Sequence, residues 1–241
     1  MRRVLTSTAL LVAAAVSTTS CGGSAPRATN PAATTTPSRS PLVPPTPAPT
    51  TPRNDPVAAP SPPATLHDGR PRRARLSIPA LGLRDVVVVP YRGETDDAPG
   101  TRIQDRGMAA SPYGPHGGVG PGGLGNYQIT GHRTSSTHPF AMLPSLRPGA
   151  RVAVVAGGVR YVYEIRRTRQ TSFRSARSLA EQRAAVPGQP GARATRAFLT
   201  LSTCATQEDH AAGNYWSDEL HNPEHRIDKI GVLVQTSPAP A

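Results

Sequence analysis

Short apolar segments with a period of two, separated by turn residues, constrain the fold of this chain more than any other feature. Seven segments have the length and the alternation of β-strands. They cover residues 75–78, 85–89, 126–130, 151–156, 160–167, 197–203 and 229–235. Gly157 and Gly158 separate two of them, which is a hairpin signal. The pattern predicts an all-β domain over residues 71–237, either a closed barrel or a sandwich.

Signals for helices and phosphate loops are weak in this part of the chain. Residues 139–146 (PFAMLPSL) predict one short helix or 3₁₀ turn, because Pro144 interrupts the apolar pattern. Residues 114–125 are a glycine-rich loop, but no lysine follows it, so it lacks the pattern of a phosphate-binding loop. Residues 238–241 are predicted to be a flexible C-terminal tail.

The N-terminus predicts export. Two arginines follow Met1, residues 9–16 are apolar, and small residues lead to Cys21. This is the pattern of a secretion signal over residues 1–21, and its apolar part is too short to span a bilayer. The approach to Cys21 resembles a bacterial lipobox, although Thr18 stands where Leu or Val is usual. Cys21 is therefore predicted to carry a lipid that holds the protein at the extracytoplasmic face of the cell membrane; a plain cleaved signal or a short uncleaved anchor is the alternative.

Residues 22–70 predict a disordered linker rich in Pro, Thr and Ala. Residues 26–63 contain thirteen prolines. Such a tract buries too little apolar surface to offset the entropy of ordering it. Its extended conformations would reach on the order of 130 Å, enough to hold a domain away from a membrane.

The charge of the chain is strongly basic. The formal net charge is +12, and Lys229 is its single lysine, so arginine supplies the excess. No dense basic helix with interleaved aromatic residues is present, which argues against a nucleic-acid partner. Attraction to anionic lipids or wall polymers explains the charge more simply. A non-catalytic surface lipoprotein that binds wall polymer is therefore one candidate function.

Cys204 ends the alternating segment FLTLSTC and suggests a second candidate function. The only other cysteine, Cys21, lies in the predicted export segment beyond the linker, so a disulfide between them is not expected. A strand-terminal thiol in a secreted chain is either a buried, inert side chain or a nucleophile. As a nucleophile it needs a nearby base or cation, because a thiol is mostly protonated at neutral pH.

His132 and Arg226 are the candidates for these partners. Among seven histidines, His132 follows the apolar strand 126–130, as Cys204 ends its own strand, and two strand ends can hold side chains rigidly together. Arg226 precedes the segment 229–235. If that segment pairs antiparallel with 197–203, Arg226 lies near Cys204, where its permanent charge can stabilise an oxyanion.

With these residues the chain resembles the sortase family of cysteine transpeptidases. The order of His132 in TGHRT, Cys204 in LSTC and Arg226 in HRID carries the resemblance, together with RLSIPALGL and PGGLGN. It covers most of residues 75–235. The TLSTC motif is nearest to the class E sortases of high-GC Gram-positive bacteria. The 21 residues between Cys204 and Arg226 are a long spacing for that class.

The resemblance implies a closed eight-stranded β-barrel with short helices that needs no cofactor. Some relatives bind Ca²⁺, but the acidic residues here form a loop run and not a converging site, so no metal is predicted. Cys204 would attack the Thr–Gly bond of a C-terminal LPxTG or LAxTG sorting signal on a secreted protein. Arg226 would hold the substrate and its oxyanion, and His132 would transfer the proton. The acceptor would be an amine of a peptidoglycan precursor or a pilin lysine. Thr203 and Ser202 would contact substrate, or else serve only in strand pairing.

An acidic run over residues 207–228 is the least defined feature. It contains six acidic residues against Arg226 alone. The run is either a solvated loop or borders the path by which a cationic amine approaches.

Other families of cysteine enzymes fit the sequence less well than the sortases do. L,D-transpeptidases carry a Ser-x-Gly-Cys pattern, which is absent here. Papain-like and amidase types place Cys before His in the chain, the reverse of the order here.

Overall fold

The computed structural model describes residues 65 and 67–240. The predicted secretion signal, Cys21 and the linker as far as residue 64 lie outside the described residues. Within the described part, none of the helices is both long enough and apolar enough to cross a bilayer.

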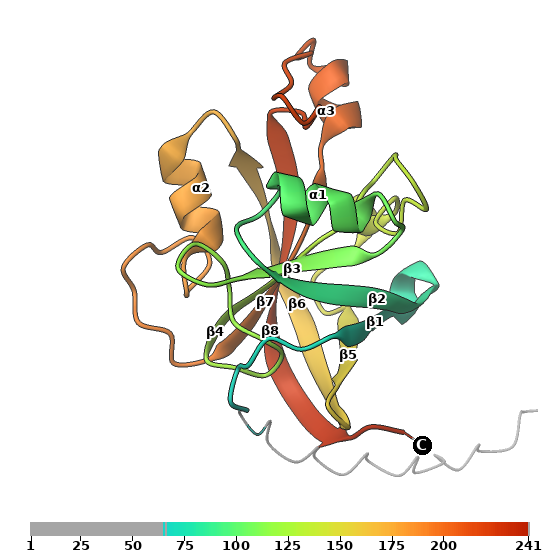
Figure 1. Ribbon diagram of the computed structural model, residues 1–241, viewed down its shortest axis with the longest axis vertical. Helices are drawn as coiled ribbons and strands as arrows, with labels where there is room; N and C mark the ends of the chain where they lie inside the picture. Colours follow the sequence, from blue (N-terminus) through green and yellow to red (C-terminus); the bar gives the residue numbers. More distant parts are fainter. Residues whose placement is uncertain (1–64, 66, 241) are drawn as a thin grey trace, which may run out of the picture. The chain divides into compact units, whose positions relative to one another are not determined.

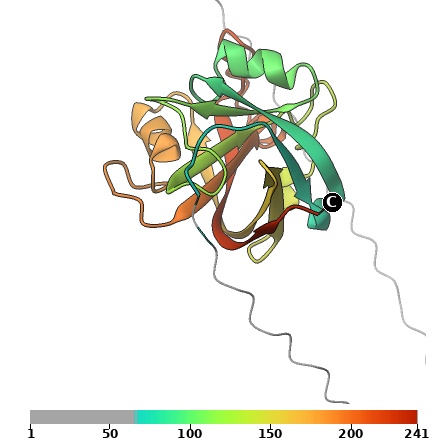
Figure 2. The ribbon, with the colours of Figure 1, turned by 60° about the horizontal axis from the view of Figure 1, so that its bottom comes forward.

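Eight strands close into a barrel (Figures 1 and 2). Their order around the barrel is β1-β2-β3-β4-β7-β8-β6-β5. The strands are β1 (Ala74–Ile78), β2 (Leu83–Arg92), β3 (Ala109–Tyr113), β4 (Gly125–Thr130), β5 (Arg151–Ala156), β6 (Val159–Ser172), β7 (Ala197–Cys204) and β8 (His225–Pro238). The pairs β2–β3 and β4–β7 are parallel, and the other pairs are antiparallel.

All seven predicted strands are present, and the closed barrel rather than the sandwich is confirmed. The predicted hairpin joins β5 to β6, where Gly157 and Gly158 have φ of 57° and 76°. Two consecutive residues with positive φ are typical of a type I′ turn, which favours glycine. The eighth strand, β3, was not predicted. Its sequence AASPY contains a proline and lacks a clear apolar alternation.

Short helices cover the outside of the barrel. They are α1 (Ala98–Gln104), α2 (Ala176–Arg183) and α3 (Thr206–Ala211), with the 3₁₀ turns η1 (Pro79–Leu81) and η2 (Leu143–Ser145). The turn η2 confirms the prediction of a short helix or 3₁₀ turn within residues 139–146. Asp97 caps α1 and Ser175 caps α2 through side-chain oxygens. Figure 1 shows α3 projecting from one end of the barrel, next to the end of β7.

The barrel core fixes which side chains of β4 and β7 face outward. Tyr127 and Ile129 of β4 and Leu199 and Leu201 of β7 belong to one buried apolar cluster. Burial of each such side chain stabilises the fold by roughly 1.5–3 kcal/mol. Because side chains alternate along a strand, the intervening polar residues and Cys204 lie on the outer face of the barrel.

Candidate active site

The pairing of β7 with β8 sets Cys204 opposite Arg226. The two residues are Cα partners in this antiparallel pair. Directly opposed residues direct their side chains to the same face of a sheet. The expected proximity of Arg226 to Cys204 therefore follows from the observed register. The thiol is free and half-buried, whereas Arg226 is completely buried.

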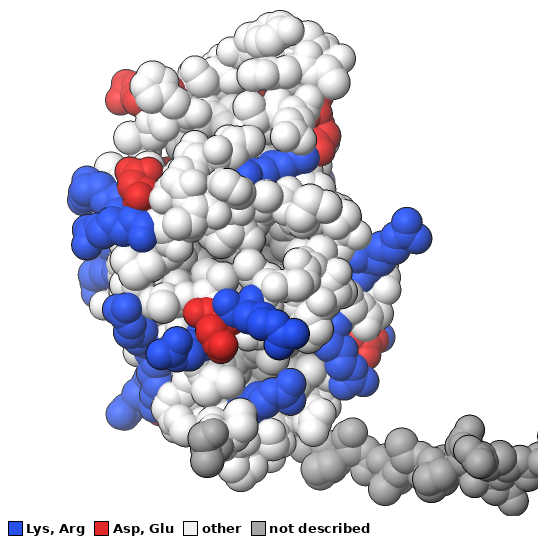
Figure 3. Space-filling model, turned by 90° about the vertical axis from the view of Figure 1, so that its right-hand side faces the viewer, with Lys and Arg blue, Asp and Glu red and all other residues white. Residues whose placement is uncertain are grey.

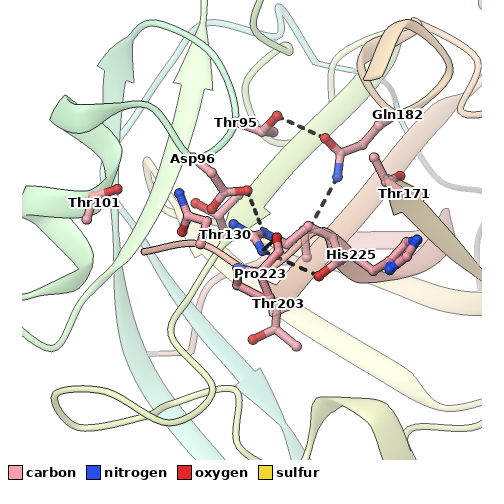
Figure 4. A network of polar contacts seen from close by, with 12 residues as sticks. Thr95, Asp96, Thr101, Thr130, Thr171, Gln182, Thr203, Pro223 and His225 are labelled. Atoms are coloured by element: carbon pink, nitrogen blue, oxygen red, sulfur yellow. Dashed lines mark hydrogen bonds and ion pairs between the residues drawn. The ribbon is translucent and has the colours of Figure 1, made fainter. Parts of the chain in front are cut away.

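Arg226 is held by a buried carboxylate and an aromatic ring. Its Nε donates to Oδ2 of Asp96 at 3.0 Å, and its guanidinium carbon lies 4.3 Å from the centre of the Phe173 ring. Burial is the largest single influence and lowers the pKa of Arg226, but Asp96, Cys204 and Asp218 together raise it, so the net shift is upward. Asp96 lies in the loop after β2 with a left-handed backbone (φ 61°), a conformation that Asp tolerates better than most residues. Nη1 of Arg226 donates to the Pro223 carbonyl at 3.3 Å, and Figure 4 shows Asp96 and Pro223 among the residues of this network.

One amino group of Arg226 is left for another partner. Its Nη2 is buried and has no hydrogen-bond partner among the described residues. Buried donors are nearly always paired, so an unpaired guanidinium N–H beside a thiol is an unusual feature. It is suited to donate to a carbonyl oxygen, or to the oxyanion formed when that carbonyl is attacked.

The end of β4 delivers His132 alongside the end of β7. The strands run parallel, with Thr130 opposite Ser202. Beyond the ladder, the Gly131 N–H donates to the Ser202 carbonyl at 3.2 Å, and Thr203 Oγ1 donates to the Gly131 carbonyl at 2.8 Å. A Cβ on Gly131 would lie 2.8 Å from the Phe140 ring, so this approach requires glycine.

The His132 imidazole is oriented by Asp105, which follows α1. Its Nε2 lies 2.8 Å from Oδ1 of Asp105. A carboxylate accepts hydrogen bonds, so Nε2 carries the proton and Nδ1 is left to exchange one. The His132 side chain is 14% exposed and that of Asp105 is 59% exposed, so water reaches this pair. Among the hydrogen bonds of residues 65 and 67–240, none joins His132 directly to Cys204.

Several charges act on the thiol in opposite directions. Burial raises the pKa of Cys204 above its ordinary value, and it is the largest influence. Arg226 and Arg133 lower this pKa, whereas Asp96 and Asp218 raise it. The net shift is upward, so the resting thiol is protonated at neutral pH and must lose its proton before it reacts as a nucleophile.

Ser202 and Thr203 are both 2% exposed and serve the structure around the thiol. The Thr203 hydroxyl holds the Gly131 carbonyl, and the Ser202 hydroxyl accepts from Nε2 of Gln182 at 3.3 Å. The same Nε2 donates to buried Asp228 at 3.0 Å, and Oε1 of Gln182 accepts from Thr95 at 2.9 Å. Figure 4 shows this contact between Thr95 and Gln182. Gln182 thus links α2, the loop before α1 and both strands of the site.

The acidic run is not a uniformly solvated loop. Asp209 is only 4% exposed. Its carboxylate lies 2.7 Å from Nδ1 of His225 and accepts from the His225 N–H at 3.0 Å. Glu208 forms an ion pair with Arg133. The solvated interpretation is therefore wrong for Asp209, which holds the start of β8 in place.

Sequence reasoning did not identify the carboxylates and amides that hold the site. Asp96, Asp105 and Gln182 are distant in sequence from the groups they bind, and no local pattern marks them. Arg133 directly follows His132, and this adjacency was the one usable signal. In the described part of the chain, no cluster of three or more His, Cys, Asp or Glu side chains is placed to hold a metal ion.

Comparison with known proteins identifies the family. The family model described as the Sortase domain matches residues 76–216, more than half of the chain. A search of curated proteins finds no match.

Solved structures share the fold. The chain is similar to the SrtA sortase from Actinomyces oris, with a TM-score of 0.53, 18% identity, and coverage of 75% of this chain and 89% of that one. It is similar to sortase E from Streptomyces avermitilis, with a TM-score of 0.50, 24% identity, and coverage of 70% and 91%. Sortase E1 from Streptomyces coelicolor, solved with a tripeptide in the active site, gives a TM-score of 0.50, 24% identity, and coverage of 72% and 94%.

Proposed function

The chain belongs to the sortase family, and on this premise we propose that it is a cysteine transpeptidase whose nucleophile is Cys204. The observation that carries the proposal is the pairing of Cys204 with buried Arg226, whose Nη2 has no partner in the described structure. A nucleophile and an unoccupied oxyanion donor on the same face of two paired strands are what acyl transfer requires.

The proposed reaction proceeds in two acyl transfers. Nδ1 of His132 takes the proton of the Cys204 thiol. The resulting thiolate attacks the carbonyl carbon of the Thr–Gly bond in the sorting signal, and the carbonyl oxygen becomes an oxyanion beside Nη2 of Arg226. The C–N bond breaks, the leaving amine takes a proton from His132, and a thioester remains on Cys204. An acceptor amine then loses a proton to His132 and attacks the thioester, which restores the thiolate. Asp105 keeps the imidazole oriented through Nε2.

The proposed substrates follow from the TLSTC motif. Its likeness to class E favours an LAxTG signal over LPxTG, and the acceptor is an amine of a peptidoglycan precursor or a pilin lysine. Lipidation of Cys21 would place the reaction at the extracytoplasmic face of the membrane. Ser202 and Thr203 are buried, so their proposed part in substrate binding is to shape the floor beneath the bound peptide.

The alternative of a non-catalytic lipoprotein that binds wall polymer has less support. Figure 3 shows basic side chains dispersed over one face, with acidic ones among them, instead of one concentrated patch. Arg151 and Arg166, for example, both lie within ion-pair distance of Glu164. No observation in the described part of the chain favours this function over catalysis.

Incubation of the full chain with LAxTG and LPxTG peptides and an amine acceptor tests the proposal. Wild type should cleave at least one peptide between Thr and Gly and join the acyl part to the amine, as detected by mass spectrometry. Cys204→Ala should lose at least about 10³-fold of this activity. Failure of wild type on both peptides with an unmodified thiol, or full activity of Cys204→Ala, would overturn it.

A further inference from the structure

Arg133 makes a set of contacts that its position next to His132 does not by itself explain. Its side chain is only 7% exposed. Nη1 donates to the backbone carbonyl of Cys204 at 3.2 Å. Nη2 donates to Oε1 of Gln207 and to Oε1 of Glu208, both at 2.9 Å, and Nη1 also binds the second Glu208 oxygen. One side chain therefore joins the segment of the proposed base to that of the proposed nucleophile.

The contacts of Arg133 join β4 and β7 beyond the point where the backbone pairing of these two strands ends. The parallel ladder of β4 and β7 stops at Thr130 and Ser202, and one more backbone bond follows, from Gly131. Cys204 lies beyond it, and α3 then begins without a side-chain cap at Ala205. On the β4 side, the Arg133 guanidinium holds both the Cys204 carbonyl and the first turn of α3, so it adds to the β8 pairing that fixes the backbone from which the thiol projects.

The Arg133 guanidinium also brings positive charge near the Cys204 thiol. Four charged groups act on Cys204 from the elements packed around it: Arg226 of β8, Asp96 of the loop before α1, Asp218 of the loop after α3, and Arg133. The neighbouring titratable groups are His132, before Arg133, and Glu208, which pairs with Arg133. Arg226, on β8, already forms an ion pair with Asp96. Arg133, which follows β4, is a second cation on the other side of β7.

We propose that Arg133 is a positioning residue for the thiol: it fixes the Cys204 carbonyl relative to His132 and adds a second cation that favours the thiolate. This inference rests on the proposed role of Cys204 as the nucleophile. Its test, however, measures the thiol alone and needs no sorting substrate, so the two proposals can fail separately.

The test is the rate of alkylation of Cys204 by iodoacetamide as a function of pH. The full chain carries Cys21→Ser, so that Cys204 is its only thiol. Arg133→Met should shift the rate profile to higher pH and slow alkylation at pH 7 by about three- to tenfold, because one unit of thiol pKa is a tenfold change in thiolate. Arg133→Lys keeps a charge within reach of the carbonyl and should recover part of the loss.

Glu208→Gln is the matched control. It removes the ion pair with Arg133 but keeps the bond from Arg133 to the Cys204 carbonyl and the positive charge. Its alkylation should be at least as fast as that of wild type. Thermal unfolding of each variant confirms that it is folded. Equal slowing in Arg133→Met and Glu208→Gln, or a pH profile for folded Arg133→Met that matches wild type, would overturn the proposal.

Discussion

Two basic side chains near Cys204, Arg226 of β8 and His132 after β4, each contact a carboxylate, and the two contacts are alike in length but not in burial. On one side Arg226 and Asp96 are 3.0 Å apart, with side chains 0% and 6% exposed. On the other side His132 and Asp105 are 2.8 Å apart, with side chains 14% and 59% exposed. A buried charge that loses its partner remains desolvated, whereas an exposed one is screened by water. Loss of the carboxylate should therefore cost much more free energy at the buried contact than at the exposed one, although the two distances are similar.

The difference matches what each side does in the proposed reaction. Arg226 stabilises charge without changing its own, so a rigid, water-excluded position suits it. His132 gains and loses a proton in each cycle, and a partly exposed position lets it exchange protons and adjust to two different amines. The buried side is thus preorganised, and the exposed side is oriented but remains adjustable.

Removal of each carboxylate in turn gives the largest expected difference. Asp96→Ala leaves the Arg226 guanidinium buried without its carboxylate, and the free energy of unfolding should fall by about 3–5 kcal/mol. Asp105→Ala is the matched control and should cost less than about 1 kcal/mol, because that pair is exposed. Urea unfolding followed by circular dichroism measures both. Equal losses in the two variants would show that burial does not separate the two sides.

A smaller effect is expected at Asp228, the buried residue two positions beyond Arg226 in β8. Burial raises the pKa of Asp228 despite the hydrogen bonds from Thr171, Ser202 and Gln182. A carboxyl whose folded pKa exceeds its unfolded pKa contributes stability at low pH, and this contribution is lost as pH rises through the folded pKa. Relative to Asp228→Asn, wild type should therefore lose stability as the pH rises from about 4 through the raised pKa.

Thr171→Val should change the pH dependence of stability in the opposite direction from Asp228→Asn. Thr171 Oγ1 donates to Asp228 at 2.6 Å, a bond that favours the ionised carboxyl. Its removal should steepen the fall in stability with pH, whereas Asp228→Asn should flatten it. Denaturant unfolding at several pH values measures both variants. Parallel pH profiles for wild type and both variants would contradict a raised pKa at Asp228.

The sequence predicted most of the barrel because alternation is a local signal. The alternation did not predict β3, whose AASPY segment contains a proline. For β6 it predicted an end at Arg167, whereas the strand continues to Ser172. The remainder of β6, residues 168–172, is polar and pairs with the start of β8, so no apolar alternation marks it. The three α-helices were also missed; they have six to eight residues and no long apolar stripe.

Part of the candidate site, like most of the barrel, could be predicted from the sequence. Cys204 and Arg226 were expected to be close from the antiparallel pairing of two strands. The partners Asp96 and Asp105 were not, because they come from loops 130 and 27 residues away from the groups they bind. Strand register can be inferred from a pattern, but the path of a loop depends on the completed fold.

Mass spectrometry of the full chain, quenched in acid while it turns over an LAxTG peptide, tests Cys204 most directly. The tryptic fragment 197–226 should carry the substrate up to its threonine as a thioester on Cys204, and added amine acceptor should discharge it. Cys204→Ala should carry no adduct. Turnover with an unmodified Cys204, or an adduct on another residue, would contradict the proposed nucleophile.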